Sequence, residues 1–326
     1  MSVLVTGVAG FIGFHVTAAL LDRGKTVVGV DNLSDYYDVS LKEMRLARFG
    51  DEKGFTFRRL DIADKDAMMA LVAEFPDIDQ VIHLAAQAGV RYSLVNPHAY
   101  IHANVAGQLV VMEACRALKK LRHLVYASSS SVYGDNNKLP FSVEDRVDNP
   151  VSLYGATKKS AELLATSYAH LYCLPVTGLR FFTVYGPWGR PDMAAFIFTK
   201  KILAGEEIAV FNGGDMKRDF TYIDDIVAGV LACLDKPFNN NGNESSHRVY
   251  NLGNHRAEPL MRFIGLIEQA LGQKAKVRME PMQSGDVKET YANIETSRRD
   301  FGFEPITSID EGLPCFIKWY RDYHGV

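Results

Sequence analysis

Cysteine is scarce in this chain, and the few cysteines present lie far apart. Four occur among 326 residues, at Cys115, Cys173, Cys233 and Cys315, and no two form a CxxC pair. Thiolate metal centres and disulfide frameworks both need cysteines at characteristic spacings. We therefore expect no metal site and no disulfide framework, and we interpret the cysteines as reduced thiols of a cytoplasmic protein.

The sequence also lacks an excess of charge of either sign. It has 36 Lys and Arg against 39 Asp and Glu, a formal net charge of -3 and a pI of about 6.3. Its basic residues are scattered rather than gathered in a stripe. Because no overall basic field attracts nucleic acid or an anionic membrane, we expect neither as a partner.

The apolar N-terminus lacks the features of a targeting or membrane-spanning segment. "MSVLVTGVAGFIGFHVTAALL" has no basic first region and no small-residue cleavage site, and it is interrupted by Thr6, three glycines and His15. Signal peptides need those features, and a spanning helix needs about 20 mostly apolar residues. We therefore expect a cytoplasmic location.

What the sequence does have is a regular alternation of β-branched runs and helical patterns. Strands are predicted at 2–6, 26–31, 55–61, 79–86, 121–129 and 174–182. Helices are predicted near 11–23, 64–74, 98–119 and 153–173. This alternation predicts an α/β protein with a doubly wound parallel sheet, whose ligands bind at the carboxyl ends of the strands.

A glycine pattern follows the first predicted strand. In "VLVTGVAGFIG", Gly7, Gly10 and Gly13 come directly after the strand and open a helix. Glycines there let the backbone approach a pyrophosphate, and the helix N-terminus offers free N–H groups to the anion. We expect Phe11 and Ile12, which lie between the glycines, to contact the same cofactor.

Acidic and small residues end the next strands. Asp31, about 20 residues after the glycines, suits the ribose hydroxyls of adenosine and repels a 2′-phosphate, so NAD is favoured over NADP. Asp61 has an alternative role as the cap of the next helix. The remaining cofactor contacts that we predict also follow strand ends: Asn32, Asp61, Ile62, Leu84, Ala85 and Ala86.

These motifs predict a Rossmann-like NAD-binding domain over residues 1–180. The alternation loosens after about residue 180, where the turn-rich "GPWGRPDM" begins. We predict a smaller UDP-sugar-binding lobe over residues 181–326, with segments near 215–252 returning to the first domain.

Two polar motifs lie near the predicted carboxyl edge of the sheet. "ASSSSVYG" (127–134) ends a buried strand in four hydroxyls, although buried polar groups must be hydrogen-bonded. Tyr154 and Lys158 are four residues apart and share one face of a helix. About one such pair is expected by chance in this composition, so its position after the serine strand is what indicates catalysis.

These motifs, together with "RDFTYIDD" (218–225), resemble those of extended short-chain dehydrogenases/reductases over the whole chain. The resemblance implies that Tyr154 is the acid/base and that Lys158 binds the nicotinamide ribose. It also implies that the Ser129 hydroxyl aligns the sugar oxygen, with Ser130 as the competing assignment. Because an ammonium and a cationic nicotinamide favour a phenolate, we expect a lowered pKa for Tyr154.

The serines after Ser129 narrow the choice among the reactions that this family catalyses. The related 4,6-dehydratases place Asp-Glu after the catalytic hydroxyl, and UDP-glucuronate decarboxylases place a Glu there. Ser130 and Ser131 cannot act as carboxylic acids. The resemblance therefore favours oxidation, rotation and re-reduction at C4, which is a 4-epimerisation with NAD.

Two loops indicate a uronate substrate. Residues 32–46 and 180–193 resemble those of UDP-glucuronate 4-epimerases, and Thr183 stands where UDP-galactose epimerases usually have Asn. Arg190 can grip a C5 carboxylate bidentately, although a surface salt bridge is the alternative. The resemblance adds the hydroxyls of Ser129, Ser130, Ser131 and Thr183 around the same carboxylate.

Further residues are assigned to UDP by resemblance alone. Arg218 matches the arginine that binds the UDP phosphates, and Asp286 matches an acid on the uridine ribose. Gln283 replaces an arginine of that phosphate site in galactose-type enzymes. Arg91 in "AGVRYS" is expected to face the active site without an assigned role.

Three other functions remain open at this point. A UDP-glucose/UDP-galactose 4-epimerase would differ in substrate, a true dehydrogenase would release NADH, and an NAD-sensing scaffold would have no need of Ser129, Tyr154 and Lys158. The resemblance also implies a homodimer through the helices near 98–119 and 153–173. Their apolar faces fit this, but they equally fit ordinary packing on the sheet.

Overall fold

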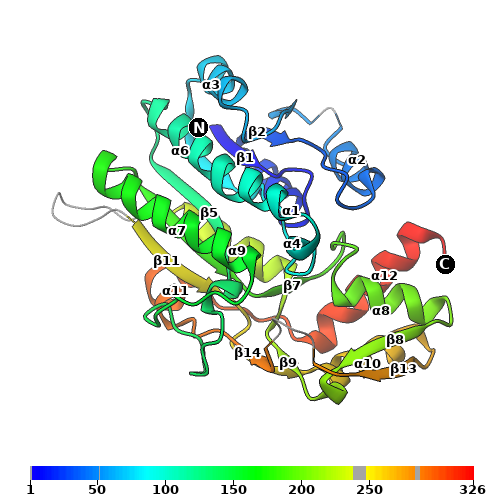
Figure 1. Ribbon diagram of the computed structural model, residues 1–326. Coiled ribbons are helices and arrows are strands. Elements are labelled where there is room, and N and C mark those ends of the chain that lie inside the picture. The colour runs from blue at the N-terminus through cyan, green and yellow to red at the C-terminus, as the bar shows by residue number, and fades with distance from the viewer. Residues whose placement is uncertain (1, 51, 238–246, 283–286) are drawn as a thin grey trace.

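A seven-stranded parallel sheet forms the centre of the computed structural model (Figure 1), which describes residues 2–50, 52–237, 247–282 and 287–326. The strand order is β11-β6-β5-β4-β1-β2-β3. The strands are β1 Ser2–Thr6, β2 Thr26–Asp31, β3 Phe55–Arg59, β4 Ile78–His83, β5 His123–Ser129, β6 Val176–Phe181 and β11 His247–Leu252. The predicted doubly wound parallel fold is confirmed.

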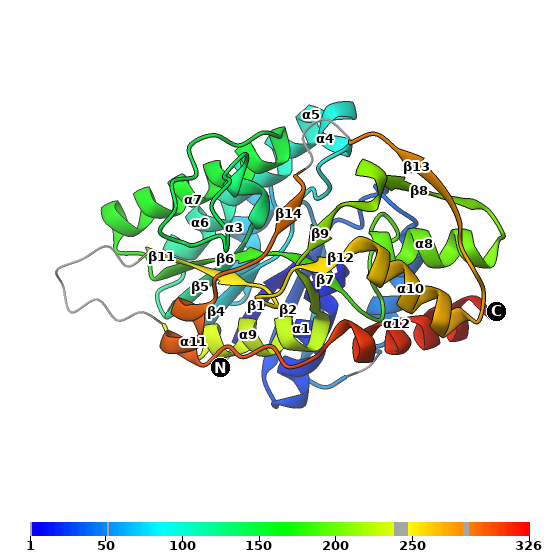
Figure 2. The same ribbon diagram turned by 90° about the horizontal axis from the view of Figure 1, so that it is seen from below.

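Helices cover both faces of this sheet, as Figure 2 shows. One layer contains α3, α6 and α7, and the other contains α1, α9 and α11. Their bounds are α1 Phe11–Asp22, α3 Lys65–Glu74, α6 Gly107–Ala117, α7 Leu153–Tyr172, α9 Ile223–Leu234 and α11 Glu295–Phe301. Two helix layers explain why the central strands are apolar along both faces.

The helix predicted near 98–119 is not continuous. It is divided into α5 Pro97–Tyr100, a π-helical segment η1 Ile101–Ala106, and α6. The wider turn of a π-helix interrupts the regular ladder and is frequent at functional sites. Here it brings Asn104 to face α7, with consequences described below.

The C-terminal lobe is built from short sheets and three longer helices. The strand pairs are β7 Thr183–Tyr185 with β10 Phe220–Tyr222, and β8 Glu207–Phe211 with β13 Lys276–Glu280. A third small sheet places β9 Lys217–Arg218 between β12 Glu258–Pro259 and β14 Glu289–Thr290. The helices are α8 Ala194–Leu203, α10 Leu260–Leu271 and α12 Ile309–His324.

The lobe and the sheet share buried side chains. One apolar cluster includes Val16 of α1, Ile226 of α9, Phe263 of α10 and Phe316 of α12. β11 pairs with β6 although it lies far along the chain. The division at residue 180 stays a prediction. Across the described ranges, no helix is both long and apolar enough to cross a membrane.

Four short elements complete the described chain: α2 Val39–Ala47, α4 Tyr92–Val95, η2 Ser130–Tyr133 and η3 Asn212–Gly214. The long helix α7 begins with a side-chain cap, because the Ser152 hydroxyl accepts from the Gly155 N–H at 3.0 Å. It ends where Cys173 adopts a left-handed conformation. The cap fixes the first turn, which contains Tyr154.

Candidate active site

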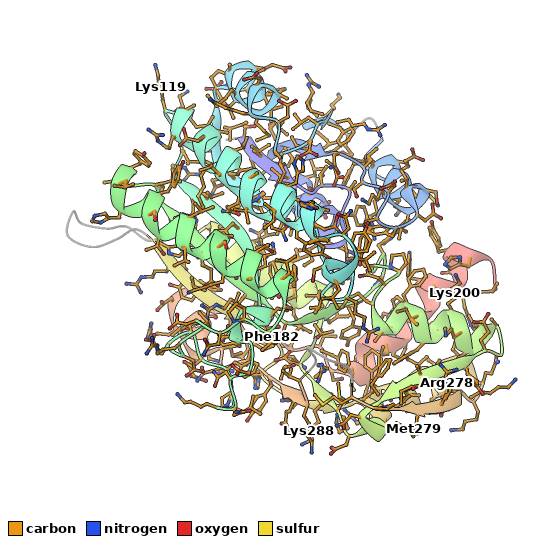
Figure 3. The ribbon with its side chains drawn as sticks, viewed as in Figure 1. Lys119, Phe182, Lys200, Arg278, Met279 and Lys288 are labelled. Carbon is orange, nitrogen blue, oxygen red and sulfur yellow. The ribbon has the colours of Figure 1, made fainter. Side chains whose placement is uncertain are left out.

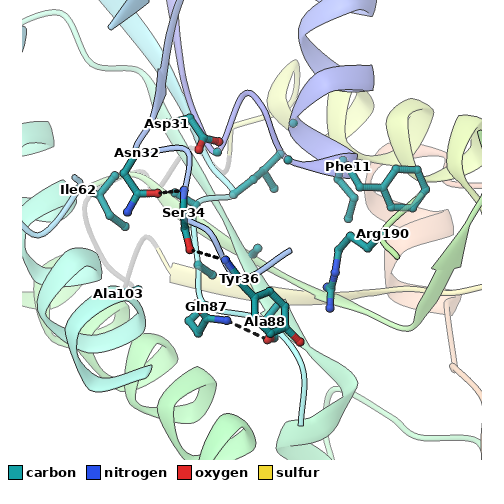
Figure 4. A pocket seen from close by; sticks show the side chains of 18 of the residues that line it. Phe11, Asp31, Asn32, Ser34, Tyr36, Ile62, Gln87, Ala88, Ala103 and Arg190 are labelled. Atoms are coloured by element: carbon teal, nitrogen blue, oxygen red, sulfur yellow. Dashed lines mark hydrogen bonds between the residues drawn. The ribbon is translucent and has the colours of Figure 1, made fainter. Parts of the chain in front are cut away.

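A cavity of about 350 Å³ lies at the carboxyl ends of the central strands (Figure 4). It is lined by every predicted cofactor residue and by four of the residues predicted for catalysis or substrate. These lining residues are Gly7, Gly10, Phe11, Ile12, Gly13, Asp31, Asn32, Asp61, Ile62, Leu84, Ala85, Ala86, Ser129, Tyr154, Lys158 and Arg190. The structure thus brings together residues that are scattered over almost 190 positions of sequence.

Four other residues predicted for the substrate are not among those that line this cavity: Ser130, Ser131, Thr183 and Arg218. Ser130 and Ser131 are half-buried in η2, and half-buried Thr183 donates its N–H to the Asp219 carbonyl at 3.1 Å. Arg218 donates to the carbonyls of Lys217 and Lys288 from β9. Their predicted roles stay predictions. Asp286 and Gln283 fall outside the described residues.

The glycine loop is packed too closely for side chains. Gly7 has φ +76°, and a Cβ there would come within 2.6 Å of the Ala85 nitrogen. A Cβ at Gly13 would overlap the Gly7 carbonyl oxygen. Backbone N–H groups at the start of α1 therefore border the cavity directly, which is the arrangement that fits a pyrophosphate.

Asp31 ends β2 beside this loop and is 8% exposed. Its carboxylate accepts from the N–H of Leu33 at 2.9 Å and of Ala9 at 3.1 Å. Burial raises its pKa, while these bonds and the charge of Lys42 act against the rise. Lys42 lines the cavity and donates to the Ser34 carbonyl at 2.6 Å. Lys42 was not predicted, because no local pattern in the sequence marks it as buried.

Asp61 lies at the cavity rather than at a helix end. It accepts from the amide of Asn32 and from the His102 ring, both at 3.2 Å. The side-chain cap of α3 is Asp64, which accepts from the Ala67 N–H at 3.0 Å. The capping alternative for Asp61 is therefore wrong.

Tyr154 and Lys158 lie one helical turn apart on α7 and meet Ser129 at the end of β5. Lys158 donates to the Ala127 carbonyl at 3.1 Å and is 5% exposed. Burial lowers the pKa of Lys158 to about 8. The three side chains line the same cavity, whereas Ser130 is not among its lining residues.

Burial has the opposite effect on Tyr154. It raises the pKa of Tyr154, against a hydrogen bond from Ser129 and the charge of Arg190, which both lower it. Without the cofactor, desolvation of the phenol is thus the largest influence on the Tyr154 pKa. The lowering expected beside a cationic nicotinamide stays a prediction.

The first serine of the row has a structural role. Ser128 donates to the Glu162 carboxylate at 2.7 Å, and Arg180 donates to both oxygens of that carboxylate at 2.8 and 2.9 Å. Arg180 and Glu162 are almost completely buried. These three side chains join β5, β6 and α7. The Ser128 hydroxyl therefore has its hydrogen-bond partner within the fold, whereas Ser129 faces the cavity.

Asn104 of the π-helical segment was also missed. Its amide donates to the Thr157 hydroxyl and to the Gln87 carbonyl, each at 3.0 Å, and its oxygen accepts from the Gln87 N–H at 2.8 Å. It therefore connects α7 with the loop after β4. A buried asparagine inside a predicted helix carries no local signal of this role.

Arg190 faces the cavity but is already paired. It donates from Nε and Nη2 to Asp192 at 3.0 and 2.5 Å, and its side chain is 22% exposed. The edge of Arg190 that was predicted to bind the substrate carboxylate through two hydrogen bonds is thus used to bind Asp192.

Arg91 lies over the ring of Phe211, with its guanidinium carbon 5.1 Å from the ring centroid. This contact joins the start of α4 to the second lobe.

The donors and contacts around this cavity fit a dinucleotide, and comparisons with known proteins agree. Residues 3–253 match the model of the NAD dependent epimerase/dehydratase family, so the chain belongs to that family. The resemblance to extended short-chain dehydrogenases/reductases and the choice of NAD are confirmed.

Individual relatives are more specific. The chain is 48% identical to UDP-glucuronate 4-epimerase 2 of Arabidopsis thaliana, over 99% of this chain and 76% of the relative. It is 34% identical to the structure of UDP-glucuronic acid 4-epimerase from Bacillus cereus with UDP-glucuronic acid and NAD (TM-score 0.90; 99% and 100% covered). UDP-glucose 4-epimerase of Thermotoga maritima with UDP-glucose is 31% identical (TM-score 0.88; 99% and 100% covered).

The buried Lys158 generates a prediction about stability. Its pKa falls from 10.5 to about 8 on folding, so the folded state holds a disfavoured charge at neutral pH. Lys158→Met should therefore stabilise the NAD-free protein by on the order of 3 kcal/mol near pH 7. The unfolded chain keeps the proton between the two pKa values, so wild-type stability rises with pH and the difference shrinks toward about pH 10.

Urea unfolding of wild type and variant near pH 7 and near pH 10 measures this difference in the free energy of unfolding. Lys119→Met is the matched control, because Lys119 projects from the surface (Figure 3) and its replacement removes no buried charge. A Lys158→Met variant that is less stable than wild type near pH 7 would contradict the assignment of a costly buried charge.

Proposed function

We propose that this protein interconverts UDP-glucuronate and UDP-galacturonate by epimerisation at C4 while retaining its NAD. The observation that carries the proposal is the convergence of Ser129, Tyr154, Lys158 and Arg190 on the cavity that also fits NAD. The names of the similar proteins support the same substrate.

The acid/base chemistry is assigned to Tyr154. When bound in this cavity, NAD would supply the hydride acceptor and donor that inversion at C4 of the sugar requires. Tyr154 takes the proton of the C4 hydroxyl and later gives it back, and Ser129 aligns that oxygen. Lys158 holds a positive charge beside the cavity, although it is only marginally protonated above about pH 8.

Arg190 is assigned to the substrate carboxylate. Its Nε and Nη2 are held by Asp192, whereas Nη1 has no hydrogen-bond partner among the described residues. Nη1 is therefore the group that we assign to the carboxylate, in place of a bidentate grip. Asp192 fixes the plane of the guanidinium, so the position of Nη1 is defined before the substrate binds.

A first experiment tests the reaction itself. Purified protein is incubated with UDP-glucuronate, with and without added NAD, and the products are identified by proton NMR. We expect UDP-galacturonate without net NADH. Tyr154→Phe should reduce kcat by about 100- to 10,000-fold, because it removes the group that transfers the proton.

Other outcomes would identify the alternatives. Conversion of UDP-glucose but not UDP-glucuronate would favour a UDP-glucose/UDP-galactose 4-epimerase, and the chain is also similar to the UDP-glucose 4-epimerase of Thermotoga maritima. Stoichiometric NADH would indicate a dehydrogenase, and inertness toward both sugars would leave an NAD-sensing scaffold.

Arg190 has a second role in this proposal. Oxidation at C4 of a glucuronate creates a β-keto acid, which loses CO2 most easily when the carboxylate bond stands perpendicular to the carbonyl plane. We propose that Arg190 holds the carboxylate away from that angle. Arg190→Ala should therefore release CO2 and a UDP-4-keto-pentose, measured by NMR.

The control for this prediction is Arg190→Lys, which keeps the charge but loses the planar group. It should leak less than Arg190→Ala. Weaker substrate binding without any leak in either variant would rule out the protective role, while leaving a role in affinity.

We also propose a homodimer through η1, α6 and α7. These neighbouring elements expose several large apolar residues, including Leu109, Leu163 and Leu171, in positions that suit a second copy. Leu163→Glu should shift the protein toward a monomer in analytical ultracentrifugation. Ile306→Glu, at an apolar position that is exposed elsewhere, should not. A wild-type monomer would refute the proposal.

The cytoplasmic location stays a prediction.

A further inference from the structure

A hydrogen-bonded chain of three side chains joins two loops at the cavity. The Tyr36 hydroxyl donates to Asp192 Oδ2 at 3.0 Å, and the same carboxylate accepts from Nε and Nη2 of Arg190. Tyr36 and Arg190 both line the cavity, and Figure 4 shows Tyr36 between Asn32 and Arg190. Tyr36 has no role in the reaction proposed for this site, and Asp192 has only that of orienting Arg190.

The strand order shows what this contact crosses. Tyr36 lies in the loop after β2, and Asp192 lies in the loop that follows β6 and β7. Within the sheet, β1, β4 and β5 separate β2 from β6. Four strand spacings of about 4.8 Å make about 19 Å, so the two loops meet across the carboxyl edge of three strands.

The cofactor would lie beneath that contact. Asp31 at β2 would hold its adenosine end, the glycine loop after β1 its pyrophosphate, and Tyr154 and Lys158 near β5 its nicotinamide end. A dinucleotide held at these three places would run along the edge that Tyr36 and Asp192 bridge.

Tyr36 is held firmly in this position. A Cβ on Gly89 would come within 2.5 Å of the Tyr36 hydroxyl oxygen, so the chain leaves space for it only because residue 89 is glycine. The Tyr36 ring also packs on Tyr92 at 4.7 Å. At neutral pH Tyr36 is a protonated donor, because burial raises its pKa to about 12.

The second loop has separate anchors. The fully buried Arg45 donates to the Trp188 carbonyl at 2.6 Å and to the Ala9 carbonyl at 2.8 Å, and the His15 ring bonds to the Pro187 carbonyl at 2.9 Å. These bonds hold the backbone of the loop next to the glycine loop. Removing the Tyr36–Asp192 bond should therefore open the crossing contact without displacing the loop.

We propose that Tyr36, Asp192 and Arg190 form a clasp that closes over NAD and slows its release. This inference deepens the proposed function, because epimerisation requires that the same cofactor molecule that takes up the hydride also returns it. Tyr36 and Asp192 thus act as cofactor-retaining residues, and the clasp must open when NAD enters or leaves.

The test measures NAD release directly. Enzyme loaded with NAD is freed of excess by gel filtration and mixed with alcohol dehydrogenase and ethanol, which convert released NAD to NADH for detection by absorbance. We expect Tyr36→Phe and Asp192→Asn each to release NAD about tenfold faster than wild type, as loss of a charge-assisted hydrogen bond predicts.

Tyr37→Phe is the matched control. Tyr37 lies in the same loop, but its hydroxyl accepts from Arg45 at 2.8 Å. Its variant should release NAD at close to the wild-type rate. Unchanged release in both Tyr36→Phe and Asp192→Asn would overturn the clasp, and so would equally fast release from Tyr37→Phe, which would indicate general loosening of the loop.

The readout also separates the two proposals. NAD release is measured without any sugar, so a protein that does not convert UDP-glucuronate can still show the clasp. Conversely, if the wild-type protein epimerises UDP-glucuronate but Tyr36→Phe and Asp192→Asn release NAD at the wild-type rate, the proposed function stands and the clasp alone is rejected. Thermal unfolding of each loaded variant checks that it is folded.

Discussion

A buried ion pair between Arg180 and Glu162 fixes the geometry on which the whole site depends. Glu162 lies on α7 two turns after Tyr154 and one turn after Lys158, so all three share one helix face. Arg180 comes from β6, and Ser128 from β5 adds a third contact. Removal of one partner of a buried pair costs about 3–5 kcal/mol, since the other charge is left without compensation. The pair therefore sets the position of α7 relative to the hydroxyl of Ser129.

Exclusion of water from the region around this ion pair also sets the acid/base properties of the site. Burial raises the pKa of Tyr154 and lowers that of Lys158. Both shifts disfavour charge, so a phenolate at Tyr154 requires additional positive charge near it. A cationic nicotinamide bound in the cavity would supply that charge, so Tyr154 would act as a base more readily with the oxidised cofactor in place.

The sequence was sufficient for those parts of the fold and site that depend on local pattern. Strand and helix alternation predicted the parallel sheet, and the spacing of Gly7, Gly10, Gly13 and Asp31 predicted the cofactor end of the cavity. Each of these features arises from neighbouring residues, so it leaves a signal within one segment.

The residues that were missed depend on long-range contacts. Lys42 and Asn104 are marked by burial, which a helical pattern does not reveal for a single polar residue. Arg190 shows a different limit. An arginine in a turn can pair with a substrate or with its own chain, and only the structure shows that Asp192 takes its bidentate edge. The net effect of burial on Tyr154 was missed for the same reason, because desolvation is a property of the whole site.

The loop that contains Arg190 and Asp192 takes part in both proposed roles, the retention of NAD and the protection of the keto intermediate. During turnover the keto sugar and the reduced cofactor exist together, and loss of either one ends the reaction without a product. Arg190 lines the cavity and, through Asp192, contacts the loop after β2. In the two roles that we propose for it, a single guanidinium would connect the substrate carboxylate with the clasp over NAD. Because its two edges serve different partners, replacement by lysine keeps the charge but cannot keep both connections.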